Sequence, residues 1–137
     1  MKLEELVPPL ELCKKIPAGE FEDSAFLWEA VVDMNTGETV NTHTVPRPSR
    51  IGCNPFVYHE IAKEFHLYPA PTFDEILDEL HKCQEDVFVK WSETAYHGWL
   101  VNAYSHGRNE DYQAHDQIKT TAAMKLWLEV KGIKDEQ

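Results

Sequence analysis

The sequence predicts an α+β fold in which two β-hairpins form an antiparallel sheet and about three helices pack against it. Two segments alternate apolar and polar residues around turn residues, and three others repeat apolar residues at helical spacing. No long βαβ crossover accompanies the hairpins, which favours antiparallel pairing over a parallel sheet. A chain of 137 residues is also the right size for one domain, predicted here to span residues 1–137.

The N-terminal half begins with an irregular arm, residues 1–20, in which one short helix is expected between Pro9 and Lys15. Proline suits the first turn of a helix, and Pro17 and Gly19 end it. The first hairpin is predicted over residues 24–45. Its first strand, SAFLWEAVVD, is rich in β-branched and aromatic residues, NTGE supplies the turn, and TVNTHTV alternates.

Two helices are predicted in the middle of the chain. Asn54 and Pro55 resemble a helix start, and Val57, Ile61 and Phe65 recur every four residues, which indicates a helix over residues 55–66. The second, over 73–83, follows a capping box of the form T-x-x-E and carries leucines on one face and carboxylates on the other.

The C-terminal part is predicted to form a second hairpin and a last helix. The hairpin covers residues 86–105, where two alternating aromatic strands flank the polar connection SETA. The last helix is expected over residues 111–131, with Ile118, Ala122 and Leu126 on one stripe. Gly132 is a natural C-terminal stop, and Ile133 can fold back on the last turn.

Residues 67–133 resemble a known group of proteins. The stretch YPAPTFDEILDEL, the aromatic hairpin and TAAMKLWLEVKGI are together similar to small uncharacterised proteins encoded by bacteriophages and prophages. The resemblance implies a mobile genetic element of a bacterium as the genomic setting. It implies no catalytic residue, cofactor or reaction.

The charge of the chain limits the partners that we expect. Thirteen basic and 24 acidic residues give a formal net charge of −11, which repels phosphate backbones and anionic membranes. We therefore expect a protein partner rather than nucleic acid or a membrane, and no cofactor. The N-terminal stretch, with acidic residues among its leucines, is expected to be neither a signal peptide nor a membrane anchor, so a cytoplasmic location is the default expectation, while the oligomeric state stays open.

Histidine is the most unusual residue type, with seven in the chain. His97, His106 and His115 are nine residues apart, and histidine ligates zinc and similar metals. A straight strand separates His97 from His106 by roughly 25–30 Å at about 3.3 Å per residue, so a metal or binding site would involve His106, Arg108 and His115 instead. The alternative is that all of them are unconnected polar residues.

Cys53 is the candidate nucleophile. It precedes Asn54 and Pro55, so its thiol would lie beside the start of the predicted helix, where the helix dipole favours thiolate, and Arg50 would add to this effect. Cys13 and Cys83 are expected to be apolar filling. Three cysteines without a CxxC pair predict neither a disulfide framework nor a thiolate zinc site.

Trp91 and Trp99 face each other across the second hairpin and are candidate binding residues. If their sheet face is open, they form a recognition surface; if the last helix covers it, they belong to the core. Trp127 on that helix favours the core.

Two functions from different classes remain. The first is a non-enzymatic accessory or interaction protein of a phage or prophage, in one form an acidic inhibitor that occupies the basic groove of a host protein. The alternative is a small hydrolase that depends on a metal or on Cys53.

Overall fold

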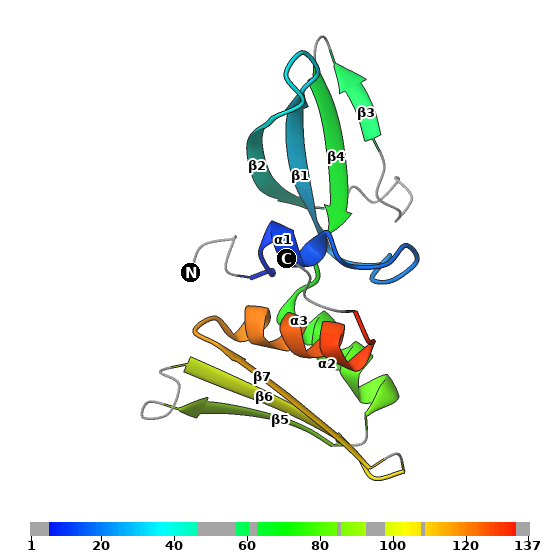
Figure 1. Ribbon diagram of the computed structural model, residues 1–137, viewed down its shortest axis with the longest axis vertical. Helices are drawn as coiled ribbons and strands as arrows, with labels where there is room; N and C mark the ends of the chain where they lie inside the picture. The colour runs from blue at the N-terminus through cyan, green and yellow to red at the C-terminus, as the bar shows by residue number, and fades with distance from the viewer. Residues whose placement is uncertain are drawn as a thin grey trace.

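The computed structural model describes residues 6–46, 57–60, 63–84, 86–92, 98–107 and 109–133, with residues 57–60 described at the backbone only. Its elements, in chain order, are α1 (Leu10–Cys13), β1 (Phe26–Asp33), β2 (Thr39–Pro46), β3 (Val57–Glu60), β4 (Lys63–Pro69), α2 (Phe73–Cys83), β5 (Asp86–Ser92), β6 (Gly98–Ser105), β7 (Glu110–Asp116) and α3 (Lys119–Val130). The predicted α+β class with antiparallel pairing is confirmed. The two hairpins, however, belong to two separate sheets, one above and one below the short α1 in Figure 1.

The first sheet has four strands in the order β2-β1-β4-β3. The hairpin predicted over residues 24–45 is confirmed as β1 and β2, with Phe26 opposite Pro46 and a register shift after Val31. Its turn is set locally, because the Asp33 carboxylate accepts the backbone N–H of Asn35 at 2.8 Å and Gly37 takes a φ of 76°.

The predicted helix over residues 55–66 is wrong. The described part of this segment forms β3 and the start of β4, which pair with each other, and β4 also pairs with β1. Pairing on both sides satisfies the backbone of β4 without helical hydrogen bonds, so sheet formation overrides the local four-residue repeat. The chain before Pro69 is also extended, as a residue that precedes proline prefers.

The second sheet has three strands in the order β5-β6-β7. The predicted hairpin over 86–105 is confirmed as β5 and β6, with Trp91 opposite Trp99. The predicted helix over 111–131 is wrong in its first half: residues 110–116 form β7, which pairs with β6. Its sequence, EDYQAHD, alternates in exposure as a strand does, and Asn109 turns the chain with a φ of 52°.

Both long helices cover one face of this second sheet (Figure 1). The predicted helix over 73–83 is confirmed, including its capping box: the Glu75 backbone N–H donates to Thr72 and the Thr72 backbone N–H donates to Glu75. Helix α3 ends at Val130, and Gly132, the predicted C-terminal stop, follows with a φ of 78°. The Ile133 N–H then donates to the Leu128 carbonyl at 2.8 Å, which closes the helix.

Two apolar clusters form the interior of the part of the chain that the structure describes. The larger lies between α2, α3 and the second sheet, and its members include Ile76, Leu80 and Trp127. The smaller joins α1 to β1 and includes Trp28, whose indole N–H donates to the Pro8 carbonyl at 2.7 Å. Helix α1, predicted between Pro9 and Lys15, belongs to both clusters and so connects the two sheets. None of the helices in the described ranges has the length and apolar character needed to cross a membrane.

Candidate functional site

A hollow of about 640 Å³ lies between α2 and the turn that precedes β1. Six carboxylates and one ammonium group line it: Glu20, Glu22, Asp23, Glu75, Asp78, Glu79 and Lys82. We call this feature the acidic hollow. Its two walls come from segments about fifty residues apart in the sequence, so the concentration of negative charge is a product of the fold.

The turn that forms the first wall is anchored by Phe21. Its ring packs on Trp127 with the centroids 4.8 Å apart, although Phe21 must adopt a φ of 57° to do so. A left-handed backbone at a non-glycine residue costs about 1 kcal/mol, and burial of the ring against Trp127 offsets that cost. The anchor places Glu20 and Glu22, its neighbours on either side, at the rim of the hollow.

Helix α2 forms the second wall, and Glu75 fixes it to the first. One carboxylate oxygen of Glu75 accepts the N–H of Thr72 at 2.9 Å in the capping box, and the other accepts the N–H of Ala25 at 3.0 Å. Glu75 therefore connects the start of α2 to the start of β1. The sequence placed the carboxylates of residues 74–79 on a solvated face, and Asp78 is indeed exposed, but Glu75 has this structural role as well.

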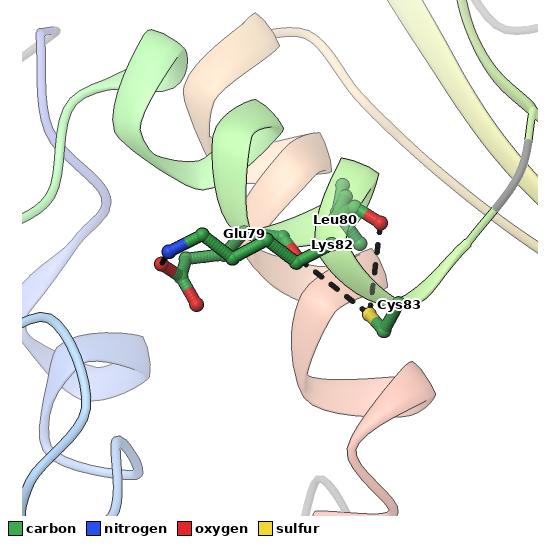
Figure 2. A network of polar contacts seen from close by, with 4 residues as sticks. All are labelled: Glu79, Leu80, Lys82 and Cys83. Atoms are coloured by element: carbon green, nitrogen blue, oxygen red, sulfur yellow. Dashed lines mark hydrogen bonds and ion pairs between the residues drawn. The ribbon is translucent and has the colours of Figure 1, made fainter.

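Lys82 is the only cation that lines the hollow among the described residues, and it is paired. Its ammonium group lies 2.7 Å from the Glu79 carboxylate, which raises the pKa of Lys82 (Figure 2). On the same turn of α2, the Cys83 thiol donates to the backbone carbonyls of Glu79 and Leu80 (Figure 2). The pairing leaves the hollow strongly negative.

The acidic hollow is not predicted from the sequence, because the segment that forms its first wall carries no motif. The signal that could have found it is the segment GEFED, residues 19–23, in which three of five residues are acidic. Residues 19 and 20 fall in the predicted irregular arm, and residues 21–23 precede the predicted first hairpin.

The candidate histidines are not brought together. His106 lies at one end of the second sheet, where its ring nitrogen contacts Asp86 at 2.8 Å. His115 is opposite Leu100 in the register, four residues along β7 from the partner of Tyr104. At about 3.3 Å per residue, His106 and His115 are therefore more than roughly 13 Å apart along the strands. Within the described ranges, no group of three His, Cys, Asp or Glu residues is arranged to hold a metal ion.

Cys53, Arg108 and His97 lie outside the described residues, as does Arg50. Of the other histidines whose side chains are described, His43 contacts Glu29 at 2.8 Å and His66 contacts Glu64 at 2.9 Å. Each of these histidines thus has a carboxylate neighbour, like His106.

Trp91 and Trp99 form an edge-to-face pair with ring centroids 5.4 Å apart. Trp91 is 47% exposed, and Trp99 is partly covered by the ammonium group of Lys119, which lies 5.2 Å from the centroid of its ring. Trp127, in contrast, is fully buried. The two candidate tryptophans therefore lie at the border of the helix-covered face, and Trp91 contributes exposed aromatic surface.

Comparison with known proteins gives no match: no protein family, no curated protein and no solved structure is significantly similar to this chain.

Proposed function

We propose that this chain acts by binding the basic surface of another protein, as an accessory protein of a bacteriophage or prophage. The observation that carries the proposal is the acidic hollow, where, among the described residues, six carboxylates from two distant segments meet with one ammonium group that is already paired. A concave surface of one charge sign concentrates its field and attracts a partner of the opposite sign.

The overall charge supports the same conclusion. A net charge of −11 steers a basic protein toward the chain and repels nucleic acids. A host protein whose basic groove normally holds nucleic acid is the partner that fits best, and the chain then acts as an inhibitor that occupies this groove. The phage resemblance of residues 67–133 is consistent with that role.

The experiment is capture of partners from bacterial lysate on the immobilised full chain, followed by affinity measurement with the purified partner at low and high salt. We expect a basic protein that is released at high salt and displaced by an excess of a short DNA duplex. Replacement of the acidic turn, Glu20→Gln with Glu22→Gln and Asp23→Asn, should lower the affinity about tenfold or more, since each charged contact contributes up to about 1 kcal/mol.

A matched control removes the same number of negative charges elsewhere. Glu11, Glu38 and Glu129 are exposed and do not line the acidic hollow, so their replacement by glutamine should change the affinity far less. Equal losses in the two triple variants would show that net charge, and not the hollow, is what the partner senses. Binding that salt does not weaken would contradict the proposal itself.

A further inference from the structure

Strand β5 is an unpaired edge of the second sheet and carries exposed apolar side chains on both faces. It pairs with β6 on one side, and the order β5-β6-β7 leaves its other side open within the described ranges. Phe88 is 60% exposed, Trp91 47% and Val89 37%. An edge strand offers free backbone N–H and C=O groups, and proteins usually protect such edges with charges, prolines or bulges. β5 has no proline and one lysine, Lys90.

The other edge strands differ in kind. β7 is polar along its open face and contains Glu110, Asp111 and Asp116. β2, at the edge of the first sheet, ends in Pro46 and is mostly polar, although Val40 is exposed. β3 is only four residues long. Edge pairing with another strand is therefore concentrated at β5.

The pattern of β5 is self-complementary. Asp86, Phe88 and Lys90 alternate along the strand and so share one face, the face away from α2 and α3. If a second β5 runs antiparallel with Phe88 opposite Phe88, the Asp86 of each copy faces the Lys90 of the other. Two opposite-charge pairs then flank one aromatic pair, and each arrangement of this kind stabilises an antiparallel sheet.

We propose that two copies of the chain associate through β5 in this register, around a two-fold axis at Phe88, and join their three-stranded sheets into one continuous sheet. A two-fold axis requires that the same patch be complementary to itself, which the order acid, aromatic, base satisfies. In the neighbouring register, centred on Val89, Asp86 would face Ser92 and Lys90 would face Phe88, with no charge pairing. This inference is independent of the acidic hollow, which shares no residue with β5.

The test is analytical ultracentrifugation of the full chain at about 0.3 M salt, where screening over roughly 5–6 Å weakens the repulsion between two chains of like net charge. We expect the wild-type chain to sediment at twice its mass of 15.8 kDa. Asp86→Lys places cations opposite cations and Lys90→Asp places carboxylates opposite carboxylates, so each should weaken self-association about tenfold or more.

The decisive arm is a mixture of the two single variants. In a mixed pair every cation again faces a carboxylate, so the mixture should associate about as strongly as the wild type. Asp86→Lys also removes the contact with His106, and His106→Ala, which removes the same contact without changing the strand, should remain dimeric. Circular dichroism of each variant should match the wild type.

A wild-type chain that stays monomeric at the highest concentration reached would overturn the proposal. So would a dimer that neither single variant weakens, because it would use another surface. A dimer that both variants weaken, but whose mixture fails to associate, would overturn the register centred on Phe88.

Discussion

Cys13 and Cys83 show how strongly the surroundings of a residue change its chemistry. The Cys13 thiol is buried and donates to the Pro8 carbonyl at 3.6 Å, and burial raises the pKa of this thiol far above its ordinary value. Cys83 is only partly buried, at the end of α2. From the sequence we expect both cysteines to be apolar filling. For Cys13 the physical reason is the burial of its thiol.

We predict that Cys13 resists alkylation in the folded protein. Only the thiolate reacts, and burial disfavours it. Native labelling with iodoacetamide at about pH 8, close to the ordinary thiol pKa, followed by peptide mass spectrometry, should leave Cys13 unmodified. Labelling in denaturant provides the control. Equal rates of Cys13 labelling in both states would show that the α1 segment does not shield it. The enhanced reactivity predicted for Cys53 loses its basis, because it depended on a helix over residues 55–66 and residues 57–60 form β3 instead.

At the scale of elements, α2 is the part of the chain in which local sequence and tertiary structure agree most closely. Its capping box, its buried Ile76 and Leu80 and its exposed Asp78 all follow from the helical spacing. The segments at 57–66 and 110–116 show the opposite case. Strand β4 depends on the distant β1, but β3 with β4 and β7 with β6 are hairpins between segments close in the chain, whose short apolar repeats do not distinguish a strand from a helix.

Leu80→Ala is expected to lower the free energy of unfolding by roughly 2–5 kcal/mol, because Leu80 is completely buried between α2, α3 and the second sheet. Asp78→Ala, on the exposed face of the same helix, should change it by no more than about 0.5 kcal/mol. Urea unfolding followed by circular dichroism measures both values. Similar losses for the two variants would mean that α2 is not packed on the face described here.

At the scale of the whole molecule, the short helix α1 and Glu75 connect the two sheets. Leu12 packs in the larger apolar cluster, while Leu10 and Cys13, two residues away at most, pack in the smaller one. Glu75 connects the start of α2 to the start of β1 by two hydrogen bonds. These connections favour the predicted single domain, which remains a prediction.

We therefore expect the chain to unfold in one cooperative transition, with calorimetric and van't Hoff enthalpies that agree. Leu12→Ala should lower stability by roughly 2–4 kcal/mol, as truncation of a buried leucine does. It should lower the melting temperature of the entire molecule, because α1 holds both clusters. Two separable transitions, of which Leu12→Ala shifts only one, would show that the sheets unfold as independent units.

The sequence by itself determined the α+β class, both hairpins, helix α2 with its cap, and the glycine stop of α3, because turn chemistry, capping and short-range alternation act between residues close in the chain. It did not reveal β3, β4 and β7, the division into two sheets, or the acidic hollow. Strands β3 and β7 pair with segments close in the chain, but their short apolar repeats do not distinguish a strand from a helix. The pairing of β4 with β1, the division into two sheets and the acidic hollow depend on which distant segments become neighbours, as Glu20 and Asp78 do. Only the tertiary structure decides which distant segments become neighbours, because neither of two such segments carries a periodic pattern that identifies the other.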